Sequence, residues 1–327
     1  MSTGQSKKFF ALPMSEKMQA PHPPGGSHHR GYSAPGVEKV SQHEYDAAEL
    51  TKLREVGHIS PSPIPPPSHA HTLPLQQTPD YKESFESGNP LDTSQPNIWP
   101  PDTTLPGFKA FLESYFTVCA SLVHSILDAL SIALKVPAPG LSPTHSESLF
   151  QLRLLHYPSI AASQLKDNVR SRINAHSDFG TLTLLFQDSV GGLEVEDPHK
   201  QGSFRPAPPI EDTVLVNIGD LMARWSNDRW RSTVHRVGLP PPSASAVAKS
   251  RIPGPGVNTE GERMGRVVEE AEIVPDRYSI PFFATANMEA VIEALPGCWD
   301  EVERPKKYEP VTAWGYVQMR MAALYDS

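Results

Sequence analysis

The longest regular pattern of hydrophobic positions lies at 107–135 and has a helical period. Apolar side chains recur at steps of three and four residues, so they share one face of a helix; they are Phe111, Tyr115, Cys119, Leu122, Ile126 and Leu130. Pro106 precedes this segment, and Pro137 and Pro139 follow it, as expected at the ends of a helix. Two shorter patterns predict helices at 5–18 and 310–325. We expect the long helix to be a scaffold that packs on a sheet.

After residue 147 the hydrophobic runs become short. They lie at 150–157, 180–186, 192–196, 212–218, 233–238 and 278–284, separated by Gly, Pro and Asp turns. This spacing predicts an all-β sandwich or barrel, so the fold class is mainly β with flanking α. We expect a helical and irregular region at 1–105, a scaffold helix at 106–146, and a β core at 147–327 that ends in a helix.

Composition narrows the class of protein. The 327 residues are 38% hydrophobic and 20% charged, which is typical of a globular protein. The net charge of −8 disfavours nucleic acid and anionic membranes as partners. We find no apolar run of the ~20 residues that a membrane span needs, and no secretory signal at the amino terminus. Cys119 and Cys298 are the only cysteines, so no disulfide framework is expected, and we predict a cytoplasmic protein.

Candidate chemistry begins with the triplet His176-Ser177-Asp178. In an extended chain, residues two apart point to the same side, so His176 and Asp178 can reach one metal ion. His235 is the candidate for a second histidine. Two histidines and one carboxylate with open positions are typical of non-haem Fe(II) oxygenases. The chain has 13 histidines, however, so the triplet alone is also compatible with a structural or surface histidine.

A second group of residues suits a carboxylate ligand. Arg277 and Ser279 form a same-face pair in an extended segment, and Tyr157 could supply another hydroxyl. A guanidinium fork and a hydroxyl give charge-assisted hydrogen bonds to a carboxylate. Taken alone, however, the pair favours the simpler interpretation of an ordinary surface Arg-x-Ser.

Several segments, in order, resemble the isopenicillin N synthase-like family of Fe(II)/2-oxoglutarate-dependent dioxygenases. They cover 147–327 and are His176-Ser-Asp-Phe-Gly-Thr-Leu-Thr-Leu-Leu, Gly191-Gly-Leu-Glu-Val, Val216-Asn-Ile-Gly-Asp220, Ser232-Thr-Val-His-Arg-Val237 and Arg277-Tyr-Ser-Ile-Pro-Phe-Phe283. The resemblance implies a distorted double-stranded β-helix (jelly roll). It also implies that His176, Asp178 and His235 hold Fe(II), and that Arg277, Ser279 and Tyr157 bind 2-oxoglutarate.

Three features depart from the family pattern. The chain enters that pattern late, as though initial elements were missing, and residues 52–80 are longer than the usual connection. An insertion at about 239–272 separates His235 from Arg277. It is either a lid over the substrate or a disordered loop, and its composition favours disorder.

The resemblance implies an oxidoreductase that uses Fe(II), 2-oxoglutarate and O2 to oxidise a C–H bond of a small molecule, releasing succinate and CO2. The pattern resembles fungal members of secondary metabolism, including those that hydroxylate polyketides or expand a ring to a tropolone. Candidate substrate residues are Tyr32, Phe85, Arg153, Leu155 and Phe283. No obligatory protein partner is evident. The alternatives are an Fe(II) oxidase without 2-oxoglutarate, a non-catalytic β-barrel that holds zinc or nothing, and a zinc hydrolase.

Overall fold

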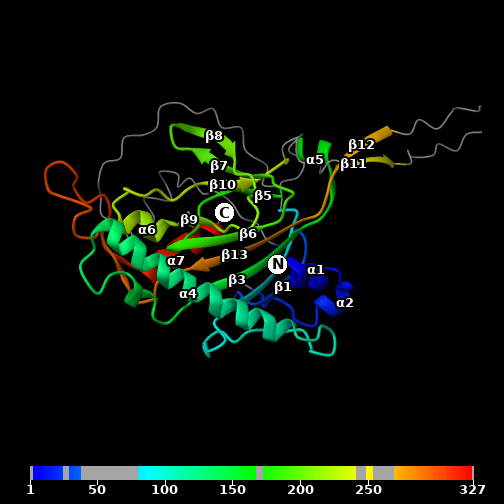
Figure 1. Cartoon of the computed structure of the whole chain (residues 1–327), viewed down its shortest axis with the longest axis horizontal. Helices are drawn as coiled ribbons and strands as arrows, with labels where there is room; N and C mark the ends of the chain where they lie inside the picture. Colours follow the sequence, from blue (N-terminus) through cyan, green and yellow to red (C-terminus); the bar gives the residue numbers. More distant parts are fainter. Residues whose placement is uncertain are drawn as a thin grey trace, which may run out of the picture.

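The computed structural model describes residues 3–24, 29–37, 80–166, 172–240, 248–252 and 269–325. Two antiparallel sheets form its core (Figure 1). The larger has the order β1-β2-β3-β13-β6-β9, with β1 (Gly31–Ser33), β2 (Glu83–Gly88), β3 (Gln151–Tyr157), β13 (Arg277–Ala284), β6 (Leu182–Gln187) and β9 (Leu215–Ile218). The smaller has the order β5-β10-β7-β8, with β5 (Ile173–His176), β10 (His235–Val237), β7 (Leu193–Asp197) and β8 (Lys200–Pro206). This is the double-stranded β-helix, so the predicted fold class is confirmed.

Smaller elements surround the two sheets. They are β4 (Ile160–Ala161), α5 (Ala162–Lys166), β11 (Ala248–Ile252), β12 (Glu269–Val274), β14 (Val291–Ile292), β15 (Val311–Thr312) and η1 (Ser142–His145). Within the insertion expected at 239–272, β11 and β12 pair antiparallel and β12 also pairs with β4. Residues 241–247 and 253–268 of the insertion, and 52–79 of the long connection, lie outside the described residues.

The helix α4 (Phe108–Leu134) covers the larger sheet. Its buried residues recur at helical spacing and are Phe108, Leu112, Phe116, Cys119, Val123, Leu127, Ser131 and Leu134. The ring of Phe116 meets Phe282 of β13 edge to face at 5.1 Å. By length and composition α4 is apolar enough to cross a membrane, which corrects the expectation that no run approaches that length. Its buried face, however, is part of the main hydrophobic core.

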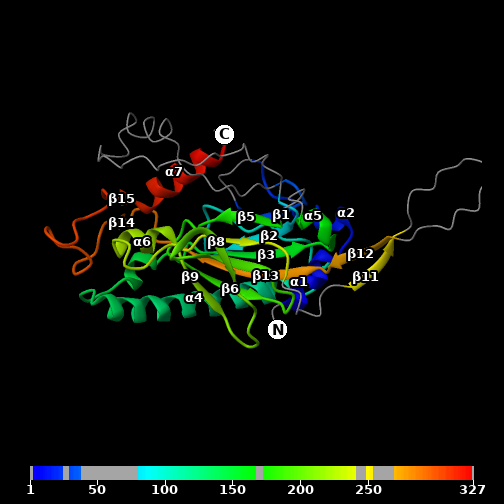
Figure 2. The same cartoon turned by 90° about the horizontal axis from the view of Figure 1, so that it is seen from above.

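The remaining helices lie at the two ends of the chain. The segment expected as one helix at 5–18 forms α1 (Thr3–Phe10) and α2 (Met14–Lys17), with Pro13 at the start of the second. The C-terminal helix α7 (Ala313–Tyr325) and the short α6 (Asp220–Trp225) lie near the opposite end of the sheets from α1. Figure 2 shows α4 along one side of the strands and α7 along the other. The strands are therefore flanked by a helix on each of these two sides.

Candidate active site

His176, Asp178 and His235 meet where the smaller sheet faces the larger one. His176 ends β5 and His235 begins β10, and the two are direct cross-strand partners. Their ring centroids lie 4.3 Å apart, and His235 Nε2 is 3.8 Å from Asp178 Oδ1. One ligand atom from each of the three residues lies within 4.8 Å of the others. The structure thus brings together the three residues that the sequence suggested as metal ligands.

Backbone carbonyls fix the orientation of both imidazole rings. His176 Nδ1 lies 2.8 Å from the Asn174 carbonyl, and His235 Nδ1 lies 3.0 Å from the Thr233 carbonyl. A carbonyl oxygen only accepts, so each Nδ1 carries a hydrogen, and in the neutral ring Nε2 is then the nitrogen with the lone pair. Metal-binding histidines typically have this arrangement. The donor set therefore fits an Fe(II) ion.

The carboxylate of Asp178 is held by two neutral donors of the larger sheet. Thr183 Oγ1 donates to Asp178 Oδ2 at 2.7 Å, and Asn217 Nδ2 donates to the same oxygen at 2.8 Å. Both bonds go to Oδ2, whereas Oδ1 is the oxygen that faces His235. One carboxylate oxygen is thus used to fix the side chain, and the other is available to a metal.

Electrostatics favour the protonation states that a cation needs. Burial, with a smaller contribution from neighbouring His235, lowers the pKa of His176 to about 3. Burial alone would raise the pKa of Asp178, but the two histidines and the bonds from Thr183 and Asn217 outweigh it and lower that pKa. At neutral pH the cluster therefore has a neutral His176 and an ionised Asp178.

Close backbone contacts hold the chain that follows Asp178. A Cβ at Gly180 would lie well inside 3.0 Å of the Ala284 carbonyl oxygen, and a Cβ at Gly219 would lie equally close to the Gly180 carbonyl oxygen. The Asp220 amide also donates to the Asp178 carbonyl at 2.9 Å. Because only glycine permits such approaches, these contacts fix the position of the metal-binding segment.

Arg277 lies at the start of β13 and is 1% exposed. Its Nε donates to the Gly191 carbonyl at 2.9 Å, its Nη1 to Ser279 Oγ at 3.1 Å and its Nη2 to Gln187 Oε1 at 3.2 Å. The guanidinium also lies over the ring of Tyr157, 4.9 Å from its centroid. Within the described part of the chain, no carboxylate lies within ion-pair distance of Arg277. A buried guanidinium of this kind suits a ligand carboxylate.

One cavity of about 1700 Å³ contains both the metal cluster and Arg277. Apolar side chains surround the Arg277 end; they are Leu155, Ile173, Leu185, Leu193, Leu215 and Val237. Leu155, which we expected on the substrate side, belongs to this group because it is the cross-strand partner of Ser279. Tyr157 lies in the same cluster.

Polar residues form another wall of the cavity. The Arg153 guanidinium pairs with the fully buried carboxylate of Glu86, which also accepts from Gln151 Nε2 at 2.5 Å. His29 Nδ1 lies 3.7 Å from the same carboxylate. Phe283 lines the cavity, as expected, and so does Phe179, which follows Asp178 directly. This wall offers both hydrogen-bond donors and an acceptor.

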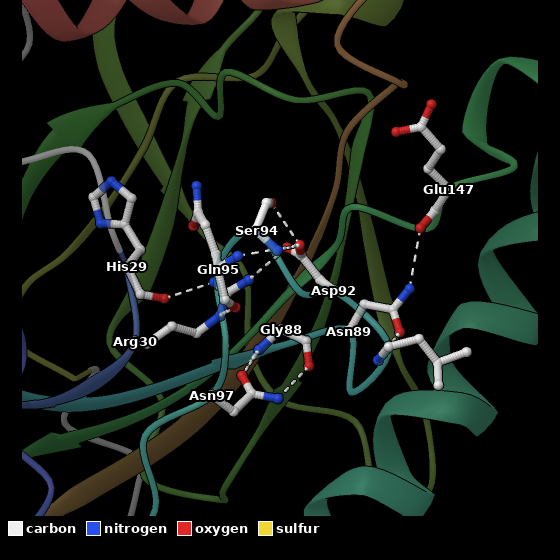
Figure 3. Close-up of polar contacts among 10 residues, drawn as sticks. His29, Arg30, Gly88, Asn89, Asp92, Ser94, Gln95, Asn97 and Glu147 are labelled. Carbon is white, nitrogen blue, oxygen red and sulfur yellow. Dashed lines mark hydrogen bonds and ion pairs between the residues drawn. The ribbon is translucent and has the colours of Figure 1, made fainter.

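Arg30 holds the segment after β2, from which Asp92, Ser94 and Gln95 line the cavity (Figure 3). Arg30 donates to the Gln95 carbonyl at 3.2 Å and lies 3.5 Å from Asp92 Oδ2. Asp92 Oδ1 accepts from the Ser94 amide at 2.9 Å. A Cβ at Gly88 would overlap the Arg30 guanidinium, so that group fills the place of a side chain there.

Phe85 and Tyr32, which we predicted to contact the substrate, are surrounded by other parts of the fold. Phe85 is fully buried and packs against Phe9, Phe108 and Trp99, so its prediction as a pocket residue is wrong. Side chains alternate between the two faces of β2, and Phe85 lies on the face that packs against the core under α4. Tyr32 borders the cavity, but its hydroxyl donates to buried Glu83. That hydroxyl is therefore engaged in the fold.

Sequence reasoning missed several residues of the site. They are Glu86, Gln151, Phe179, Thr183, Asn217 and Gln187. Thr183 and Asn217 are cross-strand partners in β6 and β9, facing Asp178 from two strands. Glu86 lies directly opposite Arg153 because β2 pairs with β3 in this register. The others also depend on strand register, which the sequence pattern does not specify.

Comparison with known proteins gives consistent matches. Residues 149–252 match the 2OG-Fe(II) oxygenase superfamily, and residues 2–102 match the N-terminal domain of the non-haem dioxygenase in morphine synthesis. The chain is 36% identical over 321 residues to the 2-oxoglutarate-dependent dioxygenase htyE of Aspergillus rugulosus, covering 98% of this chain and 83% of the relative. It is also 36% identical, with the same coverage, to the proline hydroxylase buaE of Petromyces alliaceus.

Solved structures agree with this result. A full-length Neurospora crassa protein, solved in complex with alpha-KG, superposes with a TM-score of 0.72 at 35% identity, covering 98% of this chain and 81% of that one. The same protein with alpha-KG and thymine gives a TM-score of 0.69 at 36% identity, covering 99% of this chain and 82% of that one.

Proposed function

The chain belongs to the 2OG-Fe(II) oxygenase superfamily, and from this premise we propose that His176, Asp178 and His235 hold its Fe(II). The protein is a 2-oxoglutarate-dependent dioxygenase, an oxidoreductase with Fe(II) and 2-oxoglutarate as cofactors. The observation that carries the residue assignment is the convergence of one possible ligand atom from each of the two histidines and from Asp178 within 4.8 Å. Three ligands leave open positions on an octahedral ion.

We assign Arg277 and Ser279 to the distal carboxylate of 2-oxoglutarate, with Tyr157 beside them. The guanidinium has no carboxylate partner among the described residues, and apolar side chains enclose the space between it and the metal cluster. A short aliphatic chain with a carboxylate at its end matches this combination of an apolar wall and a buried cation. When bound, iron and 2-oxoglutarate would supply the oxidation of a C–H bond by O2, in which one oxygen atom goes to the succinate formed with CO2 and the other serves the oxidation of the substrate.

The remaining side of the cavity receives the substrate. We propose a small cyclic molecule with an edge that both donates and accepts hydrogen bonds, such as a ring amide or imide. Glu86 supplies an acceptor, and Arg153 and Gln151 supply donors. The relatives support this class, because one is named a proline hydroxylase and another was solved with thymine. The residues of the chain orient this edge and keep water from the opposite, apolar face.

A polyketide, including the precursor of a tropolone, is the second candidate. Phe179, Phe283, Met288 and Trp314 line the same cavity and would contact an extended apolar ring system. Succinate release in the presence of each compound class separates the two candidates. Ring amides should stimulate turnover more than polyketides if the polar wall selects the substrate.

The first experiment is an anaerobic titration of metal-free protein with Fe(II) and then 2-oxoglutarate. A visible charge-transfer band should appear only when both are present, because the band requires the chelate at iron. Asp178→Ala should abolish the band, whereas Arg277→Ala should shift its appearance to higher 2-oxoglutarate concentrations. An unchanged band in Asp178→Ala would overturn the proposed ligand set.

A further inference from the structure

A second cavity lies between α6, the segment after it, and α7. Its volume is about 460 Å³. Polar and charged residues predominate in its lining, which consists of Asp220, Ala223, Arg224, Asp228, Arg231, Ser232, Lys307, Tyr308, Tyr316 and Arg320. In the described part of the chain, no residue lines both this cavity and the one that holds the metal cluster. It is thus a separate site, to which the oxidation reaction assigns no role.

The charges in this second cavity do not balance. Four cationic side chains line it, but only two carboxylates do. Arg320 pairs with Asp220, and Lys307 pairs with Asp228 at 2.9 Å. Among the described residues, no carboxylate lies within ion-pair distance of Arg224 or Arg231. Two positive charges therefore have no counter-charge at ion-pair distance, that of the exposed Arg231 and that of the partly buried Arg224. Only at the position of Arg224 is a missing partner unusual, because charges at partly buried positions are usually paired.

Arg224 shows the imbalance most clearly. Its Nη2 donates to the Glu309 carbonyl at 2.9 Å, and its guanidinium lies 4.5 Å from the ring centroid of Tyr308. Its Nε is buried and has no hydrogen-bond partner. Burial raises the pKa of Tyr308, and also that of Tyr316, so both phenols stay neutral. The aromatic rings therefore contribute cation–π contact but no counter-charge.

Two further donors face the same cavity. Ser232 Oγ is buried and, like Arg224 Nε, has no hydrogen-bond partner. Arg231 is exposed and donates to the Pro198 carbonyl at 3.1 Å, which uses one of its five N–H groups. Buried polar groups without a partner usually indicate a missing ligand or water. Here the unpartnered donors and the excess of positive charge are complementary to the same kind of ligand, an anion with several acceptor oxygens.

We propose that this cavity binds a small tetrahedral oxyanion, sulfate or phosphate in chemistry, through Arg224, Arg231 and Ser232. Two guanidinium groups and a hydroxyl can donate to separate oxygens of such an ion. The proposal is independent of the substrate oxidised at the iron. The cavity lies next to the segment His176–Asp178, because Arg320, which lines the cavity, donates from Nη2 to Ser177 Oγ at 3.4 Å.

Sulfate is the suitable probe, because it remains a dianion throughout the working pH range and does not precipitate Fe(II). We would titrate sulfate into the anaerobic protein loaded with Fe(II) and saturating 2-oxoglutarate, so that Arg277 is already occupied. Isothermal titration calorimetry in buffer of matched ionic strength, with chloride as the balancing anion, should show one saturable site. Arg224→Gln and Arg231→Gln should each weaken it at least about tenfold, the loss of one charge-assisted contact.

Lys306→Gln is the matched control, because it also removes one positive charge but from a surface pair with Glu293 outside this cavity. It should leave sulfate affinity within about twofold. Arg231 is exposed, so its variant tests the site even if Arg224→Gln impairs folding. The charge-transfer band of the loaded protein reports whether each variant is folded. Absence of saturable binding to the wild type, unchanged affinity in Arg231→Gln, or equal weakening by Lys306→Gln would overturn the proposal.

Discussion

The main cavity contains two groups of two histidines and one carboxylate. One is His176, Asp178 and His235, and the other is His22, His29 and Glu86. In both groups the possible ligand atoms lie within 4.8 Å of one another. Residue type and proximity are therefore the same, and the difference lies in what surrounds each carboxylate.

Neutral donors hold the carboxylate of the first group, whereas a cation holds that of the second. Asp178 accepts from a hydroxyl and an amide through one oxygen. Glu86 pairs with the Arg153 guanidinium through Oε1 and accepts from Gln151 through Oε2. A metal at the second group would have to bind beside the Arg153 cation and compete with Gln151 for Oε2, the oxygen that faces His29. The comparison teaches that the partners of a carboxylate decide whether a cluster of potential ligands serves a metal or a substrate.

The arginine near each of the two groups also differs in whether it has a carboxylate partner. Arg277, near the first group, has no carboxylate partner among the described residues, whereas Arg153, in the second, is already paired. In our proposal, one end of the cavity thus combines a site for a cation with a site for an anion. The other end is internally neutralised and offers hydrogen bonds without net charge.

Removing a ligand of the first group should have the largest effect. His235→Ala should abolish iron binding and lower turnover by more than about a thousandfold, as expected when one member of a catalytic unit is lost. Iron stoichiometry and succinate release would measure this. Near-normal turnover with bound iron would show that the assignment of His235 is wrong.

Removing the unpaired guanidinium should have the next largest effect. Arg277→Ala should raise the 2-oxoglutarate concentration required for half-maximal rate about a hundredfold, since charge-assisted contacts to a buried carboxylate are lost. Iron affinity should change little. Ser279→Ala removes a single neutral donor and is the matched weaker variant. An unchanged 2-oxoglutarate requirement in Arg277→Ala would place that carboxylate elsewhere.

Changing the polar wall formed by Arg153, Glu86 and Gln151 should alter turnover of the substrate but not the requirement for 2-oxoglutarate. Arg153→Gln removes the cation next to Glu86 and should lower kcat/KM for the substrate about thirtyfold, while the 2-oxoglutarate requirement stays constant. Steady-state kinetics with each compound varied in turn would separate the two effects. Equal changes in both constants would argue that Arg153 acts on the whole cavity.

Weakening the support of Asp178 should give a smaller, graded effect. Asn217→Ala leaves all three ligands but removes one hydrogen bond to Asp178 Oδ2. Iron affinity should fall about tenfold, the lower end of the usual range for such partners. Thr183→Val removes the other bond and should act similarly. Metal competition with a chelator would measure both variants, and unchanged affinity would show that the two donors do not support the ligand.

The smallest effect is expected in the second group. His22→Ala should leave iron affinity within about twofold, because Glu86 is already held by Arg153. The same chelator competition applies. A loss of one bound metal equivalent in this variant would mean that both groups bind metal, and the contrast between them would no longer hold.

Much of the strand pattern could be predicted from the sequence, because hydrophobic runs and turns alternate clearly after residue 147. The run at 278–284 corresponds to β13, and the run at 150–157 corresponds to β3. The predicted face of the long helix was less accurate. Leu122 is 37% exposed, whereas Leu112 and Phe116 are buried. On a helix that is apolar nearly all round, periodicity alone does not select the buried face.

The site was predictable where its residues are adjacent in the chain or belong to a recognisable pattern. His176 and Asp178 are two residues apart, so a single strand end places them together. Glu86 and Arg153 were harder, because their pairing depends on β2 lying beside β3. Phe85 has the properties of a pocket aromatic, but the alternation of β2 directs it to the core. Strand register, which the sequence does not state, decides these cases.

The glycine contacts beside the metal cluster also bear on how this protein can be engineered. Gly180 and Gly219 each fit against a backbone carbonyl at a distance that excludes any Cβ. A randomised library should therefore leave both codons fixed, since every other amino acid would displace the strand ends that carry the ligands. Diversity is better directed to Gln151, Arg153 and Phe283, whose side chains border the cavity on strands of the larger sheet. New substrate preferences could then be selected on an unchanged iron centre.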